Sequence, residues 1–346
     1  MENQLKKLIT ALVGYAVLRD IPAEKLLRSS NITLKELADT GTMLSPKQVS
    51  NIWLNALKMS KDHLFGLHFG ESLQLQAIGI VGEIIKSSQT IGEAVTIAAG
   101  LTHLITDLIK LEVTHDDSYF TIEFLPVNQE NCEQAVTVQT LDLLMVFVIH
   151  ELDGLLFKKL RPISVSYASP IDETEEYERI MRCVLQTGAP RNCIVFDIAY
   201  WDERIVTSNY EHQKELLKLA GHNQEAGFPN KSIRERVSSY MLSNSYIKMV
   251  NLEDVASNFN TTPRTLQRKL KEESVSFQLL ADEARKTLAL TYLKDGSFQG
   301  KEISFMLGYN ELSAFTRTFK RWTGLTPAAY RKKFLQTSEG SEISVH

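Results

Sequence analysis

Two stretches near the carboxyl end repeat one arrangement, a short helix followed by a tight turn and a second helix. The first runs from Leu252 to Lys271 and the second from Ile303 to Thr323, and 48 residues separate Val255 from its counterpart Ile303. Apolar positions coincide in the two copies, and the second turn is one residue longer. Because each copy must bury its apolar face, the repeat predicts an all-α unit containing two helix-turn-helix motifs.

Each part of the first copy has a steric reason for its place. Ala256 is small where the first helix approaches the second closely, and Asn260 tolerates the left-handed backbone conformation of a turn. Thr262 is a suitable N-cap for a helix whose first residue is Pro263. The local sequence therefore predicts where the second helix begins.

The second helix of the first copy has a basic outer face. Leu266 and Leu270 are four residues apart and face the core, whereas polar side chains share another face at helical spacing: Arg264, Gln267, Arg268 and Lys271. Arginine pairs with guanine and glutamine with adenine in the major groove, and lysine neutralises phosphate. A solvated basic helix in an ordinary bundle is the alternative for one such helix, and the repetition favours DNA binding.

The second copy repeats this division. Ser304 is its small residue and Gly308 lies at its turn, while Phe315, Phe319 and Trp322 are expected to face inward. The outward positions are Ser313, Thr316, Arg317 and Lys320, and Arg321 reaches the DNA backbone. Residues 277–293 form one long helix between the copies, which could separate the recognition helices by one DNA turn, about 34 Å.

The net charge of −4 is unevenly distributed along the chain. Residues 231–333 carry 18 Lys and Arg against 10 Asp and Glu, so the rest of the chain has a net charge of −12. A basic module joined to an acidic body suggests that one part meets a polyanion and the other does not.

The chain is long enough for two domains, at 346 residues. The stretch GHNQEAGFPN has two glycines, a proline and no helical periodicity, which is typical of a linker. We therefore expect an amino-terminal domain at 1–218, a linker at 219–230, the basic all-α domain at 231–335 and a disordered tail at 336–346.

The amino-terminal domain mixes helical and strand patterns. Helices are expected over 3–19, 45–57, 91–108, 133–156 and 172–183, with Thr90 capping the third; strands are expected as a hairpin over 111–125 and over 163–167 and 193–196. This order predicts an α+β domain. The chain lacks a run of about 18 apolar residues and a cleavable signal, so we expect no membrane association and a cytoplasmic location.

The cysteines do not indicate a disulfide framework or a cysteine zinc site. Cys132, Cys183 and Cys193 are odd in number and lack CxxC spacing. We interpret them as small buried apolar residues.

The histidines and glycines do not indicate catalysis, a metal or a cofactor. His63 and His68 are the nearest histidine pair and lack HExxH spacing, while His103 and His150 lie in apolar helices where core or interface roles are expected. No glycine run carries the GK[ST] of a P-loop or the GxGxxG of a dinucleotide site. We therefore expect no catalytic residue, metal or cofactor.

The carboxyl-terminal motifs closely resemble the AraC/XylS family of transcription regulators. The resemblance covers about 100 residues and is carried by Ile303 to Leu307, Gly308-Tyr309, Phe315 to Phe319, Lys320-Arg321, Gly324 to Pro327 and Tyr330-Arg331, with Arg285 in the connecting helix. Ser304 departs from the family's usual alanine and Asn260 from a common glycine. Both residues are small or tolerate a turn, so the fold is still expected.

The resemblance implies which residues contact DNA. The base-contacting residues would be Arg264, Thr265, Gln267 and Arg268 in the first unit, and Leu312, Ser313, Thr316 and Arg317 in the second. The phosphate-contacting residues would be Thr262, Lys271, Lys320 and Arg321. Leu312 either touches a thymine methyl group or simply packs, and packing is favoured.

The amino-terminal domain resembles the arabinose-binding-type sensing domain of some AraC-like regulators. The matching motifs are Gly66 to Gly70, Gly79 to Gly82 and Thr90 to Ala94, within about residues 15–205. The resemblance implies effector binding, homodimerisation or both. The apolar helices at 91–108 and 133–156 mildly favour an apolar effector, such as a fatty acid, although ordinary core explains them as well; the effector-binding residues stay unknown.

The sequence thus predicts a ligand-responsive bacterial regulator, an activator and homodimer that binds promoter DNA, with RNA polymerase as a further partner and the nucleoid as its location when bound. One rival is an enzyme whose catalytic amino-terminal domain is targeted to DNA. It needs a cysteine in a Pro-Cys-His context, but the residues after the cysteines are Glu133, Val184 and Ile194. A helical scaffold for an acidic protein is a third interpretation, and it leaves the repetition unexplained.

Overall fold

A computed structural model describes residues 4–39, 41–127, 133–156, 158–205, 232–244, 249–295 and 298–333. The chain forms two compact units, the first built mainly from residues up to 207 and the second mainly from residues after 231. The expected linker, the expected disordered tail and Cys132 lie outside the described residues. The exact domain limits stay a prediction.

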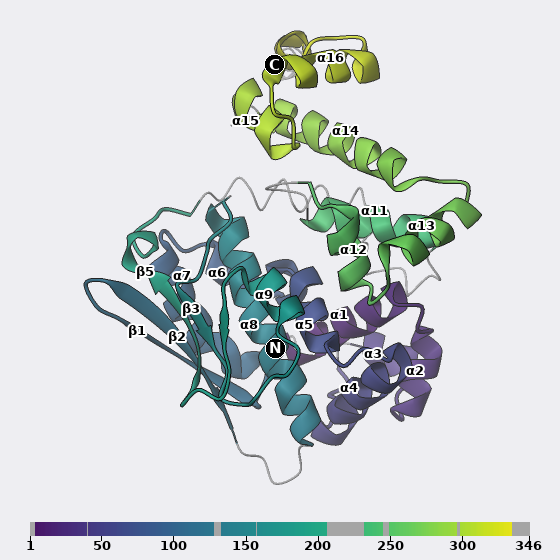
Figure 1. Cartoon of the computed structure of the whole chain (residues 1–346). Coiled ribbons are helices and arrows are strands. Elements are labelled where there is room, and N and C mark those ends of the chain that lie inside the picture. The colour runs from purple at the N-terminus through teal and green to yellow at the C-terminus, as the bar shows by residue number, and fades with distance from the viewer. Residues whose placement is uncertain are drawn as a thin grey trace, which may run out of the picture. The chain divides into compact units, whose positions relative to one another are not determined.

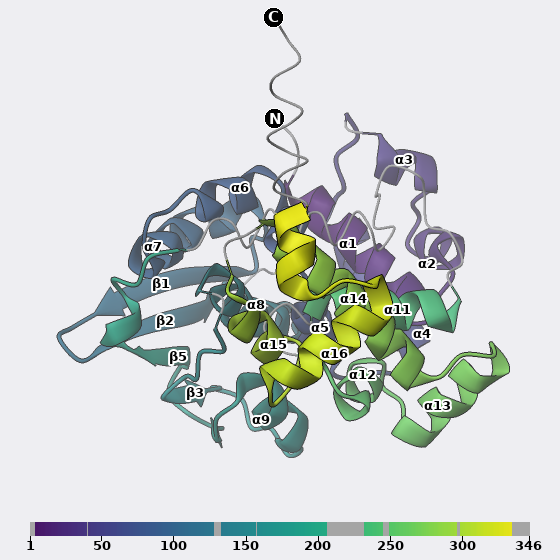
Figure 2. The same ribbon diagram turned by 90° about the horizontal axis from the view of Figure 1, so that it is seen from above.

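The first unit places helix α8 (Gln134–Leu156) between a sheet and a layer of helices (Figures 1 and 2). The sheet has the order β1-β2-β5-β3-β4, antiparallel except for the pair β3 and β4. Its strands are β1 (Ile109–His115), β2 (Tyr119–Pro126), β3 (Ser164–Ser166), β4 (Leu185–Gln186) and β5 (Asn192–Asp197). The expected α+β class is confirmed.

The other helices of the first unit precede the sheet, apart from α9 and the 3₁₀ turn η3. They are α1 (Gln4–Leu18), α2 (Ala23–Ser29), α3 (Leu34–Ala38), α4 (Pro46–Ser60), α5 (Phe65–Ser72), α6 (Ile80–Lys86), α7 (Ile91–Leu101) and α9 (Glu175–Met181), with 3₁₀ turns η1 (Leu75–Ile78), η2 (Thr102–Leu104) and η3 (Ile198–Tyr200). Ser45 caps α4 through a capping box with Gln48, and Thr90 accepts a hydrogen bond from the Glu93 N–H at the start of α7. These caps fix two boundaries that the sequence predicts.

Helix α8 is the core element of this unit. Among the described residues it is the one helix long and apolar enough to cross a bilayer, but 72% of its most apolar window is buried inside the structure. A helix that packs on both sides is apolar all round. Its apolar sequence is therefore explained by contacts with the sheet and with α5.

Two glycines allow α5 to lie directly against α8. A Cβ atom on Gly66 would lie 2.2 Å from the backbone oxygen of Gln139, and one on Gly70 would lie 2.6 Å from that of Leu143. The Gln139 side chain also accepts a hydrogen bond from the Gly66 N–H at 2.6 Å. The spacing of Gly66 and Gly70 thus serves close helix packing.

The structure corrects several sequence expectations in this unit. Helix α7 ends at Leu101 rather than near 108, because η2 turns the chain towards β1, which starts at Ile109. The helix expected over 172–183 is confined to α9, and the two-residue strand β4 was missed because it is too short to show alternation. Helices α2, α3, α5 and α6 were also missed, and each has eight residues or fewer.

The second unit is helical throughout its described residues. It contains α11 (Ile233–Asn244), α12 (Leu252–Asn258), α13 (Pro263–Glu272), α14 (Phe277–Asp295), α15 (Gly300–Met306) and α16 (Leu312–Thr323). Helix α14 packs against α11, α15 and α16, and Figure 1 shows it running between the two helix-turn-helix pairs. The all-α class and the long connecting helix are confirmed, as is the longer second turn, which spans 307–311 against 259–262 in the first.

Candidate nucleic-acid interface

Helix α13 begins and packs as its sequence predicts. The Thr262 hydroxyl accepts a hydrogen bond from the Thr265 N–H at 3.2 Å, and Pro263 is the first helical residue. Leu266 and Leu270 are fully buried, and Asn260 has a φ of 47° in the preceding turn. The small side chain of Ala256 is buried in α12. The predicted helix register is therefore confirmed.

The outer face of α13 exposes most of its predicted DNA-contacting side chains: Thr262, Arg264, Gln267, Arg268 and Lys271. Thr265 is half-buried, and its hydroxyl lies 2.9 Å from that of Thr262. Arg268 forms an ion pair with Glu272 at 2.7 Å, with both side chains exposed. Since exposed pairs contribute little free energy, a guanine could readily displace this carboxylate.

Helix α16 uses aromatic residues where α13 uses leucines. Phe315 and Phe319 are fully buried, and their ring centroids lie 5.7 Å apart. The rings of Tyr309 and Tyr330 flank them at 5.7 and 5.5 Å. The helix ends at Gly324, whose φ of 78° is favourable for glycine. Trp322, expected to face inward, is half-buried.

The outer face of α16 exposes three basic side chains from the predicted set, as that of α13 does, and in addition an apolar one. Its exposed residues from the predicted set are Leu312, Ser313, Arg317, Lys320 and Arg321, and Thr316 is half-buried. Leu312 is 44% exposed and its Cδ1 lies near Gly300 of α15, so it is not a core residue, and its contact with DNA stays a prediction. Helix α16 therefore presents an apolar side chain beside its polar ones, as contact with a thymine methyl group would require.

Arg285 joins the connecting helix to the second helix-turn-helix unit. Its Nε donates to the backbone oxygen of Leu307 at 3.2 Å, and its Nη1 donates to Asp282 at 2.9 Å. The guanidinium lies 6.0 Å from the ring centre of Tyr309. Because Leu307 is the C-cap of α15, Arg285 satisfies a carbonyl at a helix end and orients the turn before α16.

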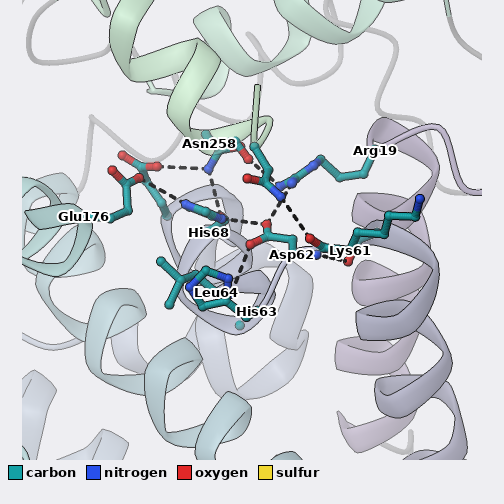
Figure 3. Close-up of polar contacts among 12 residues, drawn as sticks. Arg19, Lys61, Asp62, His63, Leu64, His68, Glu176 and Asn258 are labelled. Carbon is teal, nitrogen blue, oxygen red and sulfur yellow. Dashed lines mark hydrogen bonds and ion pairs between the residues drawn. The ribbon is translucent and has the colours of Figure 1, made fainter. Parts of the chain in front are cut away.

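The first unit contains a cluster of buried ionic side chains that the sequence did not reveal (Figure 3). Asp62 accepts hydrogen bonds from Arg19 at 2.7 Å and pairs with His68 Nδ1 at 2.7 Å. The other ring nitrogen of His68 lies 3.0 Å from Glu176, which Arg179 contacts at 2.7 Å. Glu176 and Arg179 are three residues apart and Asp62 and His68 are six apart, whereas the contacts of Arg19 with Asp62 and of His68 with Glu176 join distant segments.

This cluster shifts the pKa values of its members. Burial opposes the charge of Asp62, but the hydrogen bond with His68 and the charge of Arg19 outweigh it and lower the pKa of Asp62 to about 2. Burial likewise opposes the charge of Glu176, and hydrogen bonds with His68 and Arg179 lower its pKa to about 2. For His68, burial favours the neutral form, but Asp62 and Glu176 raise its pKa. The carboxyl groups of Asp62 and Glu176 are therefore ionised at neutral pH.

Other titratable residues of the first unit lie outside this ionic cluster. His103 is exposed and so does not have the core role that was one of its two expected roles, and its Nδ1 lies 2.9 Å from the Gly100 oxygen. Cys193 is buried as expected, whereas Cys183 is only half-buried. Burial raises the pKa of Asp142 to about 7, against the effect of a hydrogen bond from Tyr177 at 3.1 Å. Over the described ranges, no group of three or more metal-binding side chains could hold a metal ion.

Two helix-turn-helix units with exposed polar recognition helices, joined to an α+β unit, define a two-domain DNA-binding regulator of transcription. Comparison with protein-family models supports this class. The family model for the arabinose-binding domain of AraC transcription regulators matches residues 21–205, which is more than half of the chain. A helix-turn-helix domain model matches residues 255–333. The chain therefore belongs to the AraC family of transcription regulators.

Individual relatives match this chain along nearly its whole length or along part of it. The ornithine utilization regulator of Pseudomonas aeruginosa is 25% identical, over 92% of this chain and 96% of its own. The urease operon transcriptional activator of Escherichia coli is 31% identical, over 40% of this chain and 45% of its own. The solved structure of the transcriptional regulator CdpR from P. aeruginosa has a TM-score of 0.40 and 20% identity, over 88% of this chain and 97% of its own.

The protein is accordingly a DNA-binding transcription regulator with an amino-terminal domain that binds a small-molecule effector.

Proposed function

We propose that α13 and α16 enter major grooves of promoter DNA and read its sequence. In α13, Arg264, Thr265, Gln267 and Arg268 contact bases; in α16, Leu312, Ser313, Thr316 and Arg317 do so. Thr262, Lys271, Lys320 and Arg321 contact phosphates. The observation that supports this assignment most directly is the opposition on α13 between two fully buried leucines and an exposed face with Arg264, Gln267 and Arg268.

The assignment has different consequences for base-contacting and phosphate-contacting side chains. A paired guanine or adenine contact is specific, and its loss relaxes preference at one base pair. A phosphate contact acts on every sequence and releases counterions, so its loss reduces the salt dependence of binding. Thr265 and Thr316 are half-buried, and their part in base contact depends on the groove approaching them closely.

The proposed regulator is an activator that works as a homodimer in the bacterial cytoplasm, located on the nucleoid when bound, and that contacts RNA polymerase. The activator named for the urease operon supports that direction of regulation by analogy. Its effector has a largely apolar body and favours one arrangement of the protein over another, since only differential binding shifts such an equilibrium. The protein is proposed not to be an enzyme, because its relatives are named as regulators.

Genome-wide mapping of the DNA bound by the full chain tests this function. We expect a small number of sites upstream of transcription units, each containing two short conserved blocks in successive major grooves. Lower transcription of the adjacent genes after deletion of the protein supports activation, and higher transcription contradicts it. Uniform occupancy without a common sequence would contradict base reading by α13 and α16.

A further inference from the structure

An acidic side chain lies beside the basic residues on the proposed DNA-contacting face of α13. Glu272 is the last residue of that helix, and 58% of its side chain is exposed. Its Oε1 accepts a hydrogen bond from Nη1 of Arg268, four residues earlier, at 2.7 Å. Residues at this spacing are neighbours on the helix surface. The carboxylate therefore lies on the same side of α13 as a residue that is proposed to read a base.

Helix α13 itself gains little from this acid. Exposed ion pairs at this spacing stabilise a helix only weakly, and less so when the acid follows the base along the chain. The last turn of a helix also favours cations over anions, because its unsatisfied carbonyl groups carry partial negative charge. Two lysines, Lys269 and Lys271, agree with that preference and Glu272 does not. The stability of the helix therefore does not explain a carboxylate at this position.

The second helix-turn-helix unit contains a similar contact. Glu311 is the exposed N-cap residue of α16, and its Oε2 accepts a hydrogen bond from the Ser313 hydroxyl at 3.0 Å. Ser313, like Arg268, is one of the proposed base-contacting residues. In each unit an exposed carboxylate thus holds a side chain that is proposed to contact a base, and this repetition favours a role in recognition.

The contact with Glu272 changes what Arg268 contributes on different DNA sequences. Non-specific binding consists mainly of contacts between basic side chains and phosphates. While Glu272 neutralises Arg268, this arginine adds little to such contacts. A guanine at the right position offers the guanidinium two hydrogen bonds, at O6 and N7, which can replace its contact with the carboxylate. Arg268 then contributes fully only where the sequence matches.

We propose that Glu272 is a specificity-determining residue, which pairs with Arg268 on unmatched DNA and gives it up to guanine at the matching site. The inference rests on the proposed function, in that Arg268 reads a base. Glu272 itself contacts neither base nor phosphate in this arrangement. It acts by lowering the affinity for DNA in general more than the affinity for the matching sequence, and discrimination is the difference between the two.

Two duplexes test this role with the full chain carrying Glu272→Gln, which keeps the size of the side chain and removes its charge. One is the tightest binder that the unaltered protein selects from random duplexes, and the other is a scrambled duplex of the same composition. Both affinities should rise, because the repulsion between the carboxylate and the phosphates is gone. The scrambled duplex should gain more, since Arg268 becomes free to contact a phosphate there.

The ratio of the two affinities is therefore the quantity that decides. We expect Glu272→Gln to lower this ratio about threefold or more and to steepen the salt slope on the scrambled duplex by about 1, as for one added phosphate contact. Equal gains on both duplexes, which leave the ratio unchanged, would overturn the proposal. A different preferred base in a selection with Glu272→Gln would make Glu272 a base reader and would overturn it as well.

A matched control is the other exposed pair between a glutamate and an arginine, on α14. Glu283 lies 3.3 Å from Arg234, outside the proposed DNA contacts. Glu283→Gln should leave the ratio of affinities nearly unchanged, and urea unfolding should show that both variants fold as stably as the unaltered chain. An equal fall of the ratio in both variants would mean that the loss of any negative charge suffices, and would overturn the role of Glu272.

A double variant tests whether Glu272 acts through its partner. In the Arg268→Ala background, Glu272→Gln should change the ratio of affinities by less than about 1.5-fold, whereas independent effects would multiply. The same threefold fall without Arg268 would overturn the proposal and leave base reading by α13 and α16 intact. An unaltered chain that prefers no duplex, or an Arg268→Ala variant with unchanged base preference, counts against the proposed function instead.

Discussion

The two regions of this protein use charged side chains in opposite ways. In the first unit, Arg19, Asp62 and His68 are buried together, with at most 4% of each side chain exposed. On α13 and α16, by contrast, Arg268 and Arg317 are exposed. The opposite faces of these helices bury apolar residues such as Leu266 and Phe315. Charge therefore helps to hold distant segments of the first region together, whereas in the second it is available to a polyanion.

The sign and number of charged side chains in a region therefore do not show whether they stabilise the fold or bind a ligand. In a buried ion pair, the attraction between the charges roughly offsets the free-energy cost of removing them from water. Removal of one partner leaves an uncompensated buried charge. An exposed charge can be removed with little effect on folding. The same substitution should therefore alter stability in one region and DNA binding in the other.

The largest expected effect is on the buried cluster. Asp62→Ala leaves Arg19 and His68 without their shared carboxylate and should lower the free energy of unfolding by about 3–5 kcal/mol. Glu24→Ala removes the partner of Arg28 from an exposed pair and should have little effect. Urea unfolding of both variants measures the difference, and equal stabilities would contradict the comparison.

A smaller loss is expected from the contact between α5 and α8. Gly66→Ala places a methyl group against the backbone of Gln139 and should cost about 1–3 kcal/mol, because both helices must move apart. Gly100→Ala, at a helical glycine with open space around it, should leave stability unchanged or raise it slightly. Thermal unfolding distinguishes them; a harmless Gly66→Ala would show that the close approach is not required.

The ionic cluster should also make the free energy of unfolding depend on pH. Asp62 and Glu176 have pKa values lowered to about 2, so they stabilise the fold above their unfolded values near 4, and this contribution is lost as pH falls towards 2. His68 has a raised pKa, so its contribution is complete below 6.5 and is lost as pH rises through its folded pKa.

Urea titrations from about pH 2 to 9 test both slopes. His68→Gln should remove the loss on the alkaline side and reduce the loss on the acidic side, because His68 helps to lower the pKa values of Asp62 and Glu176. A variant with the same alkaline decline as the unaltered protein would show that another group is responsible.

The smallest effect is expected at a phosphate contact. Lys320→Ala should weaken binding to all DNA sequences alike and reduce the salt slope by about 1, without any change in unfolding. Lys286→Ala, an exposed lysine on α14 outside the proposed contacts, is the matched control. Binding titrations at several salt concentrations give the slope, and a sequence-dependent loss would place Lys320 among the base readers.

The second unit was more predictable than the first, because its signals are local. The cap at Thr262, the turn at Asn260 and the spacing of Leu266 and Leu270 all act within one helix-turn-helix unit, and each is confirmed. For Leu312 the sequence left packing and DNA contact open, since spacing alone does not say how far a core reaches at the first turn of a helix, and the side chain is 44% exposed.

The first unit could be assigned to its class but not resolved in detail. The ionic cluster joins Arg19 to Asp62 and His68 to Glu176, and 108 residues separate the latter two. A small apolar cavity of about 40 Å³ lies among residues of α7, α8 and the sheet. Neither arrangement leaves a periodic trace in the sequence, because both depend on which distant segments are brought together.

The base preferences of the full chain and of its Arg268→Ala and Arg317→Ala variants, measured by selection from random duplexes, test the central claim most directly. Each variant should lose about 1–3 kcal/mol on the preferred site and relax preference at one position, the two positions lying about 10 base pairs apart. Arg234→Ala, exposed on α11, should leave preference intact. Unchanged preferences in both recognition-helix variants would contradict the account.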